Sequence, residues 1–197
     1  MGLVDRAKNI ILTPKTEWPV IETEEPDTGG MITGYALPLM LLPVVGTIIG
    51  TGLLSPSGLM YGVAAGLAWL ITSLIVIVVA AFIVNVLASS FGSVANQGRA
   101  FQLVIYSNTA GWVAGILSII PVLGGFAAIA GGLYGIYLMY LGLPHTMKTP
   151  DDKRVIYVII VLAVNFLVIF VLGGMILTTV LGILGLSVLS AASAVGQ

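Results

Sequence analysis

The feature that most constrains this chain is a series of five apolar stretches that contain no Asp, Glu, Lys, Arg or His. They cover residues 32–54, 61–88, 101–120, 124–141 and 155–177. A helix that crosses the hydrocarbon core of a bilayer needs about 20 predominantly apolar residues, and each stretch reaches or approaches that length. Only helices or closed barrels satisfy their backbone polar groups in lipid. The sequence therefore predicts an all-α fold, a polytopic transmembrane helical bundle of five spans.

Composition supports this fold class and narrows the function. Hydrophobic residues make up 58% of the chain and charged residues 8%, with a mean hydropathy of +1.14, whereas soluble domains carry about 25% charged residues. There is no Cys and one His, which excludes thiolate chemistry and a His-rich metal site. Ion-coupled transporters and intramembrane hydrolases place ionisable groups inside the bilayer. We therefore expect no enzymatic activity and no cofactor.

The basic residues test the number of spans. If the N-terminus is cytoplasmic and five spans follow, every Lys and Arg lies on the cytoplasmic side, as the positive-inside rule requires. These residues are Arg6, Lys8, Lys15, Arg99, Lys148, Lys153 and Arg154. The prediction is an integral, multi-pass membrane protein with its N-terminus inside, in the inner (cytoplasmic) membrane if the source is bacterial. The seven residues form no dense patch, so we expect no nucleic-acid partner.

Residues 1–30 are predicted to form a cytoplasmic amphipathic helix and an acidic linker. At about 100° per residue, five apolar residues fall in one arc and four polar residues fall opposite. The apolar set is Leu3, Val4, Ala7, Ile10 and Ile11, and the polar set is Asp5, Arg6, Lys8 and Asn9. Two interpretations stay open: a helix lying on the membrane surface, or a helix packed on the cytoplasmic ends of the other helices. In the first, Arg6, Lys8 and Trp18 are interfacial anchors.

The acidic run that follows has three interpretations. It consists of Glu22, Glu24, Glu25 and Asp27, within a Pro- and Gly-containing segment that ends near Gly30. A solvated linker is the simplest of these. The run could instead fold over the basic cytoplasmic loops or meet a basic partner.

Residues 31–190 are expected to form the transmembrane domain, and residues 191–197 a tail. The region 175–195 is apolar and uncharged, so the charge rule does not locate it. It could continue a long or kinked fifth span, form a re-entrant segment, or make a sixth span. We favour the long fifth span.

Four of the spans contain pairs of glycines four residues apart. The pairs are Gly46/Gly50, Gly62/Gly66, Gly111/Gly115 and Gly131/Gly135. This spacing lets helix backbones approach closely. We expect the pairs to pack within one chain, with a homo-oligomer through these faces as the alternative.

The polar residues within the spans are candidates for a path or for contacts between helices. Asn85, Asn108 and Asn165 could hydrogen-bond across helices or line a permeation or lipid path. The loop before the fifth stretch holds a second candidate set, an interaction loop of His145, Lys148, Asp151 and Asp152. Thr149 is expected to cap the following helix, and a metal site is disfavoured because a single His accompanies the two Asp residues.

Several segments resemble bacterial members of the Yip family, whose eukaryotic relatives interact with Rab/Ypt GTPases. The segments are Arg6-Ala7-Lys8-Asn9, Leu12 to Trp18, Ser118 to Gly124, and Leu133 to Pro144. The resemblance covers roughly residues 1–180. It implies a five-span fold with a cytoplasmic N-terminus and a role in membrane organisation.

Together these observations predict a non-enzymatic membrane protein that binds protein partners or membrane lipids and organises membrane. The alternative is a passive channel, transporter or lipid-translocating protein with a path lined by Asn, Ser and Thr.

Overall fold

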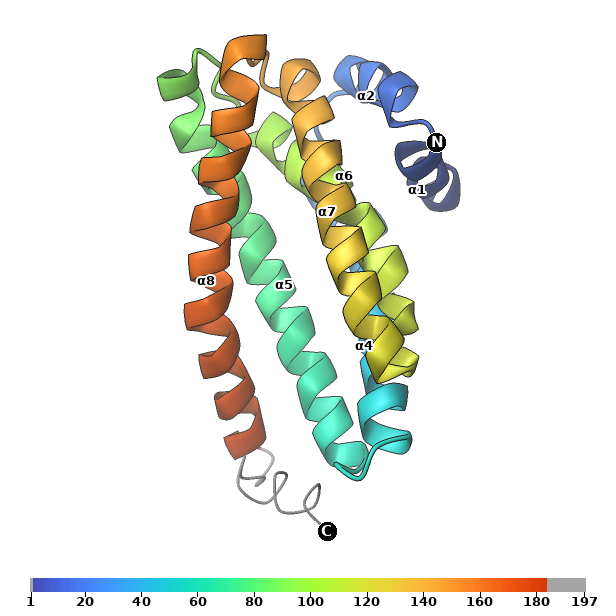
Figure 1. Cartoon of the computed structure of the whole chain (residues 1–197). Coiled ribbons are helices and arrows are strands. Elements are labelled where there is room, and N and C mark those ends of the chain that lie inside the picture. Colours follow the sequence, from blue (N-terminus) through green and yellow to red (C-terminus); the bar gives the residue numbers. More distant parts are fainter. Residues whose placement is uncertain (1, 184–197) are drawn as a thin grey trace.

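The computed structural model describes residues 2–183. Two short N-terminal helices, α1 and α2, precede the apolar segments (Figure 1). Five helical segments within the described residues are long and apolar enough to cross a membrane. They are Thr28–Leu53, Leu59–Phe91, Gln97–Ile119, Val122–Thr146 and Asp151–Ile183. The predicted class and span number are confirmed: the protein is an integral, multi-pass helical membrane protein.

The helices extend a few residues beyond the apolar stretches at most ends. Their bounds are α1 Leu3–Leu12, α2 Pro14–Thr23, α3 Thr28–Met31, α4 Leu37–Thr47, α5 Leu59–Leu87, α6 Gln97–Ala114, α7 Pro121–Thr146 and α8 Arg154–Ile183. Because α8 continues through Gly173 and Gly174, residues 175–183 belong to the fifth span. The rest of the region 175–195, and the tail 191–197, lie outside the described residues.

The first span stays helical past two prolines. Proline lacks the N–H that an α-helix needs, and Pro38 and Pro43 both fall in α4. Wider π-helical turns flank α4, at Ile32–Ala36 and Ile48–Leu53. Such local adjustments let a transmembrane helix carry proline without breaking. The span therefore runs continuously from Thr28 to Leu53.

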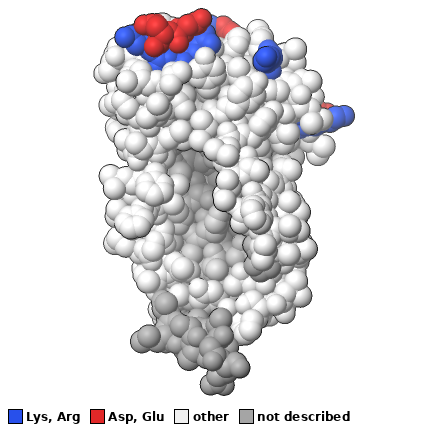
Figure 2. Space-filling model, in the orientation of Figure 1, with Lys and Arg blue, Asp and Glu red and all other residues white. Residues whose placement is uncertain are grey.

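All charged groups on the visible face gather at one end of the molecule (Figure 2). This charged end consists of α1, α2, the loop of residues 92–96, residues 147–153, and the adjoining first turns of α6 and α8. These positions are consistent with all the basic residues lying on the same side of the membrane. That this side is the cytoplasm stays a prediction.

The predicted acidic linker is shorter than expected, because helices take up both of its ends. Glu22 lies in the last turn of α2, and a new helix begins at Thr28. The Asp27 side chain caps it by accepting a hydrogen bond from the Gly30 N–H at 2.9 Å. Only residues 24–27 connect the two helices.

Glycines bring the spans into backbone contact within one chain, as expected. A Cβ atom at Gly50 would lie 2.1 Å from the Ser118 carbonyl oxygen, and one at Gly131 would lie 2.9 Å from the Gly111 Cα. No side chain fits at such separations without moving a helix. Close packing replaces the hydrophobic drive that lipid removes.

We expect Gly50→Ala to destabilise the protein by roughly 1–3 kcal/mol, because the added methyl group must displace a backbone carbonyl. The matched control is Gly34→Ala in the same span, where an added Cβ meets nothing within 4 Å. The melting temperatures of both variants in mild detergent check this. If Gly50→Ala and Gly34→Ala melt at the same temperature, the contact between the first span and residues 115–119 has room for a methyl group, and the prediction is wrong.

Candidate functional site

Helices α1 and α2 form a folded cap on the charged end, here called the N-terminal cap (residues 3–23). Its centre is Arg6, which is 5% exposed and pairs with Glu17 at 2.5 Å. Arg6 also pairs with Glu24, and its guanidinium carbon lies 5.4 Å from the centre of the Tyr106 ring. Removing one member of a buried pair leaves an uncompensated charge. The Arg6–Glu17 ion pair therefore joins α1 to α2, and the contact of Arg6 with the Tyr106 ring joins α1 to α6.

Trp18 fixes the cap to α7. The indole is fully buried, and its ring packs edge-on to Tyr106 with the centroids 6.4 Å apart. It lies over Gly142, where an added Cβ would come within 2.6 Å of the ring. Glycine at this position creates the space that the indole occupies.

Glu22 makes a second attachment between the cap and the end of α7. Its Oε2 atom lies 2.7 Å from His145 Nδ1, and its Oε1 atom pairs with Lys148. Lys148 adopts a left-handed backbone conformation with φ of 54° just after α7, as is common where a helix ends. The hydrogen bonds from Lys148 and His145 hold the pKa of the Glu22 carboxyl below its ordinary value of 4.5.

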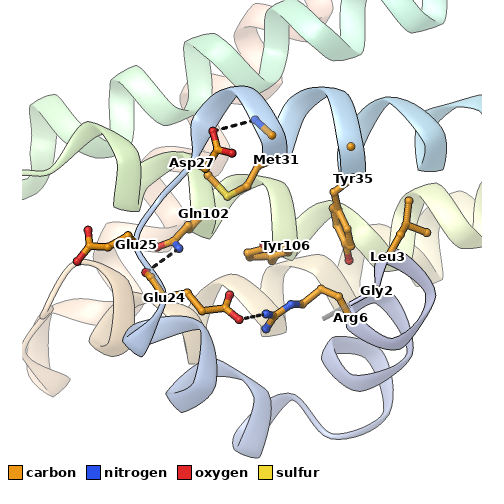
Figure 3. A pocket seen from close by; sticks show the side chains of 12 residues that line it. Gly2, Leu3, Arg6, Glu24, Glu25, Asp27, Met31, Tyr35, Gln102 and Tyr106 are labelled. Carbon is orange, nitrogen blue, oxygen red and sulfur yellow. Dashed lines mark hydrogen bonds and ion pairs between the residues drawn. The ribbon is translucent and has the colours of Figure 1, made fainter.

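A polar pocket of about 400 Å³ lies between the cap and the first and third spans (Figure 3). Arg6, Glu24, Tyr106 and Gln102 all line it. Several of their polar groups engage one another: Arg6 pairs with Glu24, and Gln102 Nε2 donates a hydrogen bond to the Glu24 carbonyl at 3.4 Å. We interpret this pocket as the joint between cap and bundle.

A second pocket of about 400 Å³ is an apolar groove between α7 and α8, with α5 and α6 behind it. Figure 2 shows the hollow on this face. The two front helices meet near the charged end, where the Arg154 guanidinium lies 5.9 Å from the centre of the Tyr140 ring. Farther along, α7 lines the groove with Gly132 and Gly135 as well as with Ile136 and Met139. The space is therefore open sideways, toward lipid.

Three uncharged polar residues line this groove: Ser107, Asn108 and Asn165. Asn108 donates a hydrogen bond to the Val104 carbonyl of its own helix at 2.8 Å. Ser107 Oγ and Asn165 Oδ1 are buried and have no hydrogen-bond partner among the described residues. A buried polar atom without a partner costs about 1–3 kcal/mol. We call these three residues the polar triad.

The structure brings together two of the three predicted Asn residues. Asn85 does not line the groove, and its buried Oδ1 also lacks a partner among residues 2–183. None of the three forms a side-chain hydrogen bond to another helix within that part of the chain. The sequence does not indicate Ser107 as a lining residue, because a single Ser in an apolar helix has no distinguishing pattern.

The predicted interaction loop is mostly engaged within the chain. His145 and Lys148 bind Glu22, Asp151 pairs with Arg154, and Asp152 lies 3.7 Å from Lys153. Thr149 does not cap the fifth span, which corrects that expectation. Its hydroxyl instead accepts a hydrogen bond from Ser93 at 2.8 Å, which ties the two loops of the charged end together.

Two of the three predicted interfacial anchors are corrected. Arg6 and Trp18 are buried in the cap, and only Lys8 is exposed. Ala7 and Ile10 of the hydrophobic arc of α1 lie in the core, and Leu3 and Ile11 pack against it, whereas Val4 is 72% exposed. Of the two interpretations of this helix, the structure supports the packed one. Of the acidic run, Glu22 pairs with Lys148 just after α7, and Glu24 pairs with Arg6 of α1.

The fold and its sites define a class: a polytopic α-helical membrane protein with a folded cap on one end. Comparison with protein families gives the assignment. A family model described as the Yip1 domain matches residues 8–173, and the chain belongs to this family. Searches of curated proteins and of solved structures found no significant match. The resemblance seen in the sequence is thus confirmed.

We expect Arg6→Met to cost roughly 3–5 kcal/mol, because it leaves the Glu17 carboxylate buried and unpaired. The double variant Arg6→Met/Glu17→Gln removes that charge and should recover a large part of the loss. Thermal unfolding in mild detergent measures both. If the double variant is no more stable than Arg6→Met, the buried charge is not the source of the cost.

The Glu22 attachment predicts a pH dependence. A carboxyl with a depressed folded-state pKa stabilises the fold above its ordinary pKa, and this contribution is lost as the pH falls through the depressed value. We therefore expect amide hydrogen exchange in α2, corrected for its intrinsic pH dependence, to accelerate only below pH 4.5. Glu22→Gln should exchange faster at neutral pH and lose this acid response.

The control for this experiment is Glu25→Gln, the same change at an exposed position three residues away. It should leave both the exchange rates and their acid response as in the unaltered protein. Identical profiles for the Glu22 and Glu25 variants would contradict the role of Glu22.

Proposed function

We propose that this protein binds a membrane lipid, with an acyl chain lying in the groove between α7 and α8. The observation that carries the proposal is the groove itself, an apolar space of about 400 Å³ that opens sideways and contains the polar triad. Ligand pockets are concave, largely apolar and furnished with a few polar groups that fix orientation. Membership of a membrane-protein family supports a non-enzymatic role, and lipid binding gives that role a physical basis.

The lining of the groove supports a lipid chain as its occupant. Gly132 of α7 lines the groove, and an added Cβ at this position meets nothing within 4 Å among residues 2–183. Phe166 and Ile169 of α8 form an apolar wall opposite. An apolar space that opens to lipid is filled most readily by a flexible hydrocarbon chain, which restores the dispersion contacts that an empty space forfeits.

The polar triad supports recognition of an uncharged part of that lipid. Ser107 Oγ can donate or accept a hydrogen bond, and Asn165 Oδ1 can accept one. A lipid hydroxyl group would satisfy both atoms, and an ester carbonyl would satisfy Ser107. No charged side chain among residues 2–183 lines the groove, so we expect this binding to depend little on headgroup charge or salt.

The same residues favour binding over aqueous permeation. An aqueous path needs a continuous polar lining, whereas Asn85 lies outside the groove and α5 contributes Val76 and Ala80 to it. We infer that the protein holds the lipid and so contributes to membrane organisation.

Filling the groove tests the proposal. An added Cβ at Gly132 meets nothing within 4 Å, so Gly132→Leu should place its side chain in the groove without straining the bundle. The control is Gly125→Leu on the same helix, where an added Cβ also meets nothing within 4 Å and which does not line the groove. Native mass spectrometry after purification in mild detergent measures the lipid retained.

We expect Gly132→Leu to lower the retained lipid severalfold and Gly125→Leu to leave it unchanged. Both variants should gain the same helix propensity, because each replaces Gly with Leu in α7. Equal lipid retention in the two variants, with both folded, would refute binding in the groove.

A further inference from the structure

We propose that the corner between α1 and α2, together with the face of α7 against it, binds the headgroup of an anionic phospholipid. The corner holds a pocket of about 390 Å³, lined by Leu12, Thr13, Pro14, Lys15 and Thr16 and by Tyr134 and Tyr137 of α7. Tyr134 donates a hydrogen bond to the Ile11 carbonyl at 2.6 Å. This bond ties the corner to α7 and fixes the pocket walls.

This pocket is separate from the groove of the proposed function. At about 100° per residue, Tyr134 and Tyr137 lie on the side of α7 opposite to Gly132, Gly135 and Met139, which line the groove. The two sites therefore share a helix but no lining residue. Binding at one does not require binding at the other.

The charge of the corner points to an anion. Lys15 is exposed and forms no ion pair with a carboxylate among residues 2–183. The carboxylate nearest to it in the sequence, Glu17, is buried and paired with Arg6. Lys8, on the exposed face of α1, also lacks an ion pair in that part of the chain, although Asp5 lies one turn before it. Lys15 is thus the cation whose charge is least compensated.

The other basic residues contrast with Lys15. Arg6, Lys148, Lys153 and Arg154 form ion pairs, and Arg99 donates to the backbone carbonyls of Ile21 and Glu24. The charged end therefore neutralises most of its cations internally and leaves the corner positive.

Apolar surface lies next to this charge. Leu12 at the corner is 66% exposed, and Val4, about 80° away around α1, is 72% exposed. On α7, Leu133 and Phe126 lie between Tyr137 and the N-terminal end of the helix, and they are 63% and 69% exposed. These positions fall in one stripe of the helix. A lipid with its phosphate near Lys15 can lay its chains along this stripe.

Tyr137 suits the boundary between the two regions. Tyr is enriched where a membrane protein passes from hydrocarbon to headgroups. Its hydroxyl forms no hydrogen bond with another described residue, so it is free to donate to a phosphate oxygen. The corner therefore offers a cation, a hydroxyl donor and an apolar support, which together match an anionic phospholipid.

Lipid titration of the full-length protein tests this inference. The detergent-solubilised protein is incubated with phosphatidylglycerol or with phosphatidylcholine of the same acyl chains, and bound lipid is counted by native mass spectrometry. We expect preferential binding of phosphatidylglycerol, weakened by salt. Lys15→Gln should lower that binding about fivefold, which corresponds to the roughly 1 kcal/mol per basic residue near an anionic surface.

The matched control is Lys153→Gln, an exposed lysine in the loop before α8, which should keep the preference. Equal binding of the two lipids by the unaltered protein would overturn the proposal and leave the corner to a protein partner. An equal loss of bound phosphatidylglycerol in Lys15→Gln and Lys153→Gln would also overturn the proposal, because the lipid would then be attracted by the overall positive charge and not by the corner. Gly132→Leu, which fills the groove, should retain the preference, so the two lipid proposals fail independently.

Discussion

The exclusion of charge from the hydrocarbon core determines the arrangement of this protein. The five spans contain no Asp, Glu, Lys, Arg or His apart from those in the first and last turns of their helices at the charged end. Groups confined to one end must find partners there or remain in water, since burial of an isolated charge is very costly. Arg6 accordingly meets Glu17 and Glu24, and Glu22 meets Lys148. The N-terminal cap is the structure that this pairing builds.

Glycine has two opposite effects in the bundle. Gly131 lies against Gly111, and the close approach of α6 and α7 depends on the absence of a side chain at Gly131, where an added Cβ would lie 2.9 Å from the Gly111 Cα. Gly132, the next residue, faces no neighbour, and the same absence of a side chain opens the groove. Spacing alone does not distinguish these two roles. The orientation of α7, which the whole bundle sets, decides which glycine closes a contact and which leaves a space.

The sequence predicts the spans well because each span is determined locally, by a run of apolar residues of sufficient length. It predicts the cap poorly because the cap depends on distant partners. Arg6 and Glu17 are 11 residues apart, and Glu22 and His145 are 123 residues apart. Trp18 shows the same limit: a Trp beside a Pro near a basic segment is typical of an interfacial anchor. Only the fold reveals that Gly142, on another helix, provides an enclosed place for its ring.

Helix α7 contacts the N-terminal cap, the corner pocket and the groove. It binds the cap through His145 and Gly142, it closes the corner pocket through the hydrogen bond from Tyr134, and its glycines open the groove on the opposite side. A helix transmits a displacement along its length because its backbone hydrogen bonds keep it rigid, and packed elements shift between discrete arrangements. A displacement of α7 relative to α8 would therefore change both the groove and the contact with the cap. The attachment of α1 and α2 to α7, which the charged residues and Trp18 provide, is what makes the short N-terminal segment part of the lipid-facing structure.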